Sequence, residues 1–154
     1  MHTDGVCDGV ATVVLANEWL RAELAPSIGG RVISLRHRPT NRELLWRNPR
    51  LTLAPCNPGD AYDPNFYGGM DELLPCDIPE TINGVDCPDH GELWTLPLVA
   101  APEGEALCLI GRLPRFGLEY RRRMRLESNR LVCDYRITNL AGAERRFLWK
   151  LQIG

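Results

Sequence analysis

The sequence predicts an all-β protein, either a β-sandwich or an open β-meander of short antiparallel strands. Three observations support this. Apolar and polar residues alternate with period two along most of the chain, turn residues separate these stretches, and no stretch keeps a 3.6-residue period over ten residues. With 154 residues, the chain is expected to form a single domain, 1–154, with a core of its own.

The first expected strands cover residues 10–17 and 20–26 (VATVVLAN and LRAELAP). The pair Gly29-Gly30 is expected to form a tight turn into a strand at 29–38. Strict alternation there puts Val32 and Ser34 on one face and Ile33 and Leu35 on the other. A short strand at 43–46 follows the turn signal PTN.

The remaining expected strands are 93–100, 106–113, 118–128 and 131–139, the last two joined at Ser128-Asn129-Arg130. The basic run 121–125 lies in one of them, so alternation puts Arg121, Arg123 and Arg125 on a solvated face that also holds acids. Arg122 falls on the apolar face, and we expect it either at a strand edge or facing a polar cleft.

Composition excludes several classes of function. A net charge of −2 gives no electrostatic reason to expect nucleic acid or an anionic membrane as partner. No apolar run is long enough to cross a bilayer, and the N-terminus shows no secretion signal. We therefore expect a cytoplasmic protein whose six cysteines are reduced thiols.

The segment 68–94 (GGMDELLPCDIPETINGVDCPDHGELW) concentrates acids, two cysteines and a histidine. Its three prolines forbid a continuous helix, and the segment is expected to be an ordered functional loop, neither helical nor stranded. His90 follows Asp89 and precedes Gly91, which permits close backbone approach. Glu92 and Trp94 come next, and carboxylates beside aromatic rings are typical of sugar sites.

Two other interpretations of His90 stay open. It is either a loop histidine with a local hydrogen bond, or a zinc ligand with Cys76 and Cys87 and with Cys56 or an acid as the fourth group. The zinc signal is weak, since no second spaced pair accompanies Cys87 and His90. Of the other histidines, we expect His2 to be disordered and His37 to lie on the surface.

Four stretches, taken in order, resemble the amino-terminal half of the aldose 1-epimerase (galactose mutarotase-like) family: LRAELAPSIGGRVISLRHRPTNRELLW, GGMDELLPCDIPE, PDHGELWTLPL and NLAGAERRFLWKLQIG. The resemblance covers nearly all of the chain from about residue 10. It implies a β-supersandwich, two large and mostly antiparallel sheets packed face to face with a sugar cleft. It also implies interconversion of the α and β anomers of free sugars, without a metal or a cofactor.

The resemblance also assigns residues. His90 matches the family's histidine in the H-G motif, and a histidine suits a general acid because its pKa lies near neutral pH. Asp71, Glu72 and Asp89 are expected to accept hydroxyl protons or orient the substrate. Further expected sugar contacts are Glu92, Trp94, which could equally be a core residue, and Gln152, which stands where the family has a second histidine.

The family's general base, a glutamate, comes from a carboxy-terminal part that these residues lack, so we expect a partial domain. If the chain is active alone, Glu72 or Glu92 would have to serve as the base. The alternatives are a non-catalytic carbohydrate-binding domain and a half-domain that assembles with a second chain. The apolar strand 145–154 would then associate through an exposed sheet edge, with another copy or another chain.

Overall fold

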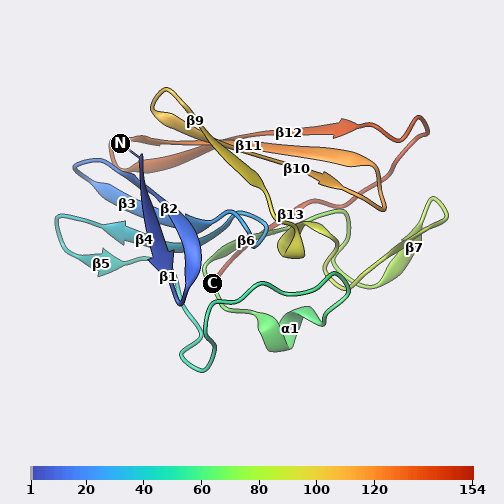
Figure 1. Cartoon of the computed structure of the whole chain (residues 1–154), viewed down its shortest axis with the longest axis horizontal. Helices are drawn as coiled ribbons and strands as arrows, with labels where there is room; N and C mark the ends of the chain where they lie inside the picture. The colour runs from blue at the N-terminus through green and yellow to red at the C-terminus, as the bar shows by residue number, and fades with distance from the viewer. Residues whose placement is uncertain (1) are drawn as a thin grey trace.

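A computed structural model describes residues 2–154 and confirms the all-β prediction (Figure 1). Two antiparallel sheets pack face to face. The larger one has seven strands. Six of them follow in the spatial order β1 (His2–Cys7), β2 (Val10–Ala16), β3 (Leu20–Ala25), β4 (Arg31–His37), β6 (Met70–Leu73) and β13 (Lys150–Ile153), and the short β5 (Arg42–Glu43) pairs with β4.

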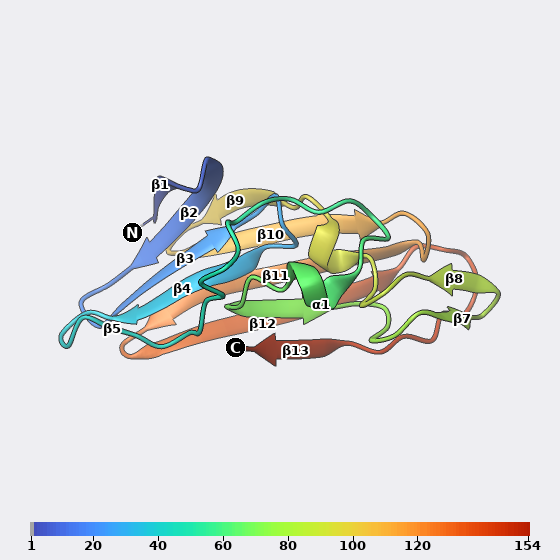
Figure 2. The ribbon, with the colours of Figure 1, turned by 90° about the horizontal axis from the view of Figure 1, so that it is seen from below.

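The second sheet has four strands, in the order β12 (Arg130–Asn139), β11 (Leu118–Glu127), β10 (Ala106–Leu113) and β9 (Val99–Glu103). A hairpin of β7 (Glu80–Ile82) and β8 (Val85–Cys87) projects at one end of the molecule (Figure 2). The helical turns are α1 (Tyr62–Asn65) and the 3₁₀ turn η1 (Leu93–Thr95). No helix within residues 2–154 is long and apolar enough to cross a membrane.

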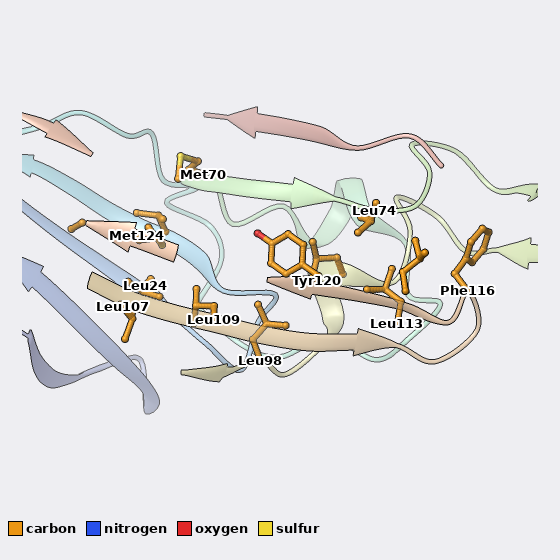
Figure 3. Close-up of a cluster of buried hydrophobic side chains, with 14 of the residues drawn as sticks. Leu24, Met70, Leu74, Leu98, Leu107, Leu109, Leu113, Phe116, Tyr120 and Met124 are labelled. Carbon is orange, nitrogen blue, oxygen red and sulfur yellow. The ribbon is translucent and has the colours of Figure 1, made fainter. Parts of the chain in front are cut away.

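The main core lies between the two sheets, where alternate residues of β3, β10 and β11 meet those of β6 (Figure 3). Burying each such side chain stabilises the fold by roughly 1.5–3 kcal/mol. Its central members include Leu24, Met70, Leu74, Leu107, Leu109, Tyr120 and Met124. This core fixes the position of β6, the strand whose outer face supports the candidate site.

A β-bulge in β4 breaks the alternation that the sequence predicts. Glu23 pairs with Ser34 but Leu24 pairs with Val32, so Ile33 is the extra residue. Val32 therefore joins the core between the sheets, while Ile33 joins a smaller cluster on the outer face of the larger sheet. The prediction that Val32 shares a face with Ser34 is wrong for this reason.

Several predicted elements differ in the structure. The strand expected at 43–46 shrinks to β5, and the start of 93–100 is the 3₁₀ turn η1. His2 is not disordered: it lies in β1, and its Nε2 is 2.9 Å from the Gly104 carbonyl oxygen. The segment 68–94 contains β6 and the β7–β8 hairpin, because these short strands find partners that no local pattern specifies.

Arg122 lies neither at a strand edge nor in a cleft. It sits on β11 between two neighbouring strands with a side chain that is fully buried. Its guanidinium donates to Glu72 at 2.6 Å and to the Gly30 carbonyl. Burial alone disfavours its charge, but Tyr120 and Glu72 beside it raise the pKa of Arg122 above its usual value.

Candidate functional site

His90 sits on the loop between β8 and η1, with its ring held on two sides. Its backbone is left-handed (φ 58°), and Gly91 after it has φ 78°. The ring stacks on Tyr62 of α1, with centroids 4.1 Å apart and planes 12° apart. Asp89 Oδ1 lies 2.7 Å from His90 Nδ1, while Asp89 Oδ2 accepts the Tyr62 backbone N–H at 2.8 Å. Asp89 therefore ties the ring to α1.

This arrangement selects one tautomer of the ring. An ionised carboxylate only accepts hydrogen bonds, so His90 Nδ1 carries the hydrogen and Nε2 is left to gain or lose a proton. Burial alone would raise the pKa of Asp89, but the hydrogen bonds from Tyr62 and His90 hold it below its usual value. Asp89 thus stays ionised at neutral pH and keeps the ring oriented.

The free nitrogen of His90 faces a second polar pair. His90 Nε2 is 3.8 Å from Asp77 Oδ1, and Lys150 Nζ on β13 is 2.8 Å from the same oxygen. The side chains of Asp77 and Lys150 are both about 40% exposed, and that of His90 is 16% exposed. His90 Nε2 therefore lies beside a carboxylate and an ammonium group that are both partly exposed.

Aromatic rings extend from His90 across the outer face of the sheet. Tyr62 contacts Phe66 at 5.5 Å, and Phe66 stacks on Trp46 at 6.1 Å, measured between ring centroids. Trp46 is half exposed. Tyr62 itself is 1% exposed, so Phe66 and Trp46 are the rings of this row that reach the surface, and exposed aromatic rings are groups on which a sugar ring can pack.

Gln152 lies between the two ends of this row. Alternate residues of β13 share a face, so Lys150, Gln152 and Gly154 point the same way. Lys150 reaches Asp77, and a Cβ at Gly154 would lie 3.3 Å from Phe66. We call this area the His90 surface, formed by His90, Asp77, Lys150, Gln152, Phe66 and Trp46.

The structure buries Asp71, one of the expected hydroxyl acceptors. Its carboxylate pairs with Arg31, also buried, and accepts the Tyr62 hydroxyl at 3.2 Å. Burial raises the pKa of Asp71 despite Arg31. In this position Asp71 anchors Tyr62, the ring under His90, and does not itself reach the surface.

Glu72 points to the opposite face, into the core between the sheets. It accepts hydrogen bonds from Arg122, from the Tyr120 hydroxyl at 2.5 Å and from Trp149 Nε1 at 3.1 Å. Adjacent residues of a strand point to opposite faces, which is why Asp71 and Glu72 do not act together.

Glu92 and Trp94 have structural contacts. Glu92 is buried and accepts the backbone N–H groups of Arg115 and Phe116 at 2.9 and 3.2 Å. Trp94 is 1% exposed, packs edge-on against Tyr62 and donates its indole N–H to the Asp89 carbonyl. Of the two interpretations of Trp94, the contacts favour core packing.

The cysteines of this segment form a disulfide, Cys76–Cys87. The expectation that all six cysteines are reduced is wrong for this pair, since the tertiary fold brings their Cα atoms to 6.6 Å. Sulfurs bonded to each other are not zinc ligands, and no cluster of three metal-binding side chains occurs within residues 2–154. The zinc interpretation of His90 therefore has no support.

Sequence reasoning missed Asp77, Lys150, Phe66 and Trp46. Asp77 lies in the stretch GGMDELLPCDIPE and Lys150 lies in NLAGAERRFLWKLQIG, two of the stretches that resemble the aldose 1-epimerase family, so a local signal for both was present. Tyr62 and Phe66 are neighbours on α1 and its C-terminal cap, but Trp46 joins them only through the tertiary fold, so no signal in the sequence indicated the row.

The other face of β13 is apolar and open to solvent. Trp149, Leu151 and Ile153 alternate with the residues of the His90 surface and are between 39 and 62% exposed. Phe147 and Leu148, just before the strand, are similarly exposed. β13 and β12 are edge strands of their sheets. That this side associates with another copy or another chain stays a prediction.

No family model matches the chain, and no curated protein matches it. The solved structures that are similar in fold include the following two. A TPR-domain containing protein from Parabacteroides distasonis has a TM-score of 0.59 and 20% identity over 82% of this chain and 20% of its own. The 4-alpha-glucanotransferase from Thermococcus litoralis has a TM-score of 0.54 and 12% identity over 89% of this chain and 24% of its own. The chain thus spans a quarter or less of either protein, and the likeness concerns the fold alone.

Proposed function

We propose that the His90 surface binds a free sugar and that His90 exchanges a proton with it, as in an aldose 1-epimerase. The observation on which this rests is the Asp89–His90 pair, with one ring nitrogen fixed and the other facing an accessible carboxylate beside an aromatic row. The resemblance of the sequence to the aldose 1-epimerase family points to the same chemistry.

In this proposal His90 Nε2 donates a proton to the ring oxygen of the sugar. A base takes the proton of the anomeric hydroxyl, the ring opens, and it recloses on either face of the aldehyde. Asp77 lies 3.8 Å from His90 Nε2, but the same oxygen is already paired with Lys150 at 2.8 Å. Asp71 and Glu72, which are buried and paired with arginines, do not serve as this base.

A second candidate is a sugar-binding domain without catalysis. Asp71 and Glu72 are both held in buried ion pairs. Among the described residues this leaves Asp77 as the one carboxylate close to the free nitrogen of His90, and the lack of an unpaired base favours binding without catalysis. The same aromatic row and Gln152 would hold the sugar in either case.

Polarimetry of freshly dissolved α-glucose and α-galactose tests the catalytic proposal, with sedimentation of the same sample to record its association state. His90→Gln should lower the mutarotation rate about 10²- to 10⁴-fold, since general acid catalysis contributes that much. His37→Gln is the matched control, because His37 is half-buried on β4 outside the His90 surface, with Nδ1 2.7 Å from the Thr40 hydroxyl and its ring stacked on Trp19.

The same samples should be titrated with each sugar in a calorimeter. Sugar binding without mutarotation would favour the binding domain. Mutarotation that survives His90→Gln would remove His90 from the mechanism, and the absence of both activities would contradict both candidates.

A further inference from the structure

A cavity of about 300 Å³ lies on the outer face of the larger sheet and shares no residue with the His90 surface. Its floor comes from β3 and β4, where Arg21 pairs with Arg36 and Glu23 pairs with Ser34 across the two strands. These four side chains alternate with core residues, so they point away from the second sheet. The walls are formed by Cys7, Ile33, Glu43, Leu45, Arg47 and Tyr67.

Arg47 is the distinctive group in this cavity. No carboxylate within residues 2–154 forms an ion pair with it. Its Nη1 donates to the Tyr67 hydroxyl at 3.3 Å, and its guanidinium carbon lies 5.9 Å from the centre of the Tyr67 ring. Tyr67 is only 3% exposed, so it holds the guanidinium from a rigid position. The remaining N–H groups of Arg47 are available to a ligand.

The two acids in the lining are already occupied by local donors. Glu23 accepts from Arg21 at 2.7 Å and from Thr12 at 2.8 Å. Glu43 accepts the Ser34 hydroxyl at 2.6 Å and the Leu35 N–H at 2.8 Å. Burial opposes its charge, but these bonds keep the pKa of Glu43 below its usual value, so it is ionised.

Three arginines and two glutamates therefore line the cavity, an excess of one positive charge. Arg21 is paired with Glu23, and Arg36 donates to Asn41 at 3.0 Å and lies 4.0 Å from Glu43. Arg47 is thus the one arginine of the lining without an acid within ion-pair distance, although Asp8, which is not part of the lining, helps to raise its pKa from farther away.

We propose that this cavity binds a small molecule through an oxyanion group, a phosphate or a carboxylate, that Arg47 holds. The planar fork of an arginine matches both groups with two parallel hydrogen bonds. The volume is at the lower end of the range for ligand pockets, which limits the ligand to one small molecule. Tyr67 acts as a positioning residue that keeps the fork directed into the cavity.

Calorimetric titration at constant ionic strength tests the proposal, with inorganic phosphate in one arm and acetate in the other to tell the two groups apart. We expect one of the anions to bind saturably with one-to-one stoichiometry. Arg47→Gln should weaken that binding by about tenfold or more, because a charge-assisted hydrogen bond is lost. Arg112→Gln is the control, since Arg112 is 74% exposed on the other sheet.

A second measurement locates the bound anion. Cys7 lines the cavity and is half-buried, whereas Cys56 is a free thiol outside it. A saturating anion should slow alkylation of Cys7 by a neutral reagent and leave Cys56 unchanged, as mass spectrometry can follow. The proposal is overturned if neither anion binds at millimolar concentration, if Arg47→Gln binds like the wild type, or if Cys7 is not protected.

Discussion

Replacing Arg122 by methionine should destabilise the protein by about 3–5 kcal/mol, which is the usual effect of removing one partner from a buried ion pair. Arg122 and Glu72 have fully buried side chains 2.6 Å apart. Methionine fills much of the same volume but leaves the Glu72 carboxylate with only two neutral donors, Tyr120 and Trp149. The substitution also removes the hydrogen bond that the Arg122 guanidinium donates to the Gly30 carbonyl oxygen. A domain of this kind has roughly 5–15 kcal/mol of stability in all.

Urea denaturation followed by tryptophan fluorescence measures this loss. With a slope of about 2 kcal/mol per molar urea, a loss of about 4 kcal/mol moves the midpoint down by about 2 M. Arg123→Met is the matched control. Arg123 is the next residue of β11, points to the opposite face, is 39% exposed and has only distant acidic partners at 3.4 and 3.7 Å. Its replacement should change stability by no more than about 1 kcal/mol.

The double variant Arg122→Met with Glu72→Gln separates the buried charge from the lost packing. Glutamine still accepts the Tyr120 and Trp149 bonds but carries no charge, so the double variant should be more stable than Arg122→Met alone. If Arg122→Met costs no more than Arg123→Met, or if the double variant is the least stable of the three, the account of this ion pair is wrong.

Two further predictions follow from the segment around His90. Denatured but unreduced protein should show four reactive thiols and reduced protein six, because Cys76 and Cys87 are bonded to each other; six thiols without reduction would contradict the disulfide. Asp89→Asn should reduce stability at neutral pH, as thermal unfolding at several pH values would show. The pKa of Asp89 is lower in the folded protein than in the unfolded chain, where it is about 3.9. Its contribution to the free energy of unfolding is therefore fully present above that value and is lost as the pH falls through the folded pKa. The gap between variant and wild type should therefore close in acid, and a gap of constant size would count against an electrostatic role for Asp89.

The local pattern of the sequence determined the sheets to a large extent. Strict alternation along 118–128 and 131–139 predicted β11 and β12 almost to the residue, since one face of each strand packs on the core and the other meets water. The same alternation identified Arg122 as the basic residue on the apolar side. A further local signal was present but not used: Asn83-Gly84 at positive φ is the favoured two-residue turn of the β7–β8 hairpin.

The candidate site could be predicted only in part. The sequence pointed to Asp89 and His90 because adjacent residues on a glycine-containing loop stay close in any fold. It also grouped Asp71 and Glu72 with them, and the structure separates these two to opposite faces of β6. Which face of a strand is buried depends on the elements that pack against it, and the local sequence does not specify those elements.

Only the tertiary structure decided the long-range pairings. Arg122 reaches Glu72 across 50 positions because β11 packs against β6 from the other sheet, and Lys150 reaches Asp77 across 73 because β13 pairs with β6, the strand that precedes Asp77. Contacts between separate segments also produce the Cys76–Cys87 bond, the bulge at Ile33 and the cavity beside Arg47. Alternation along a strand is fixed by the period of the backbone and is written in the sequence. The identity of a partner is fixed by the packing of whole sheets, and so it appears only when the chain is folded.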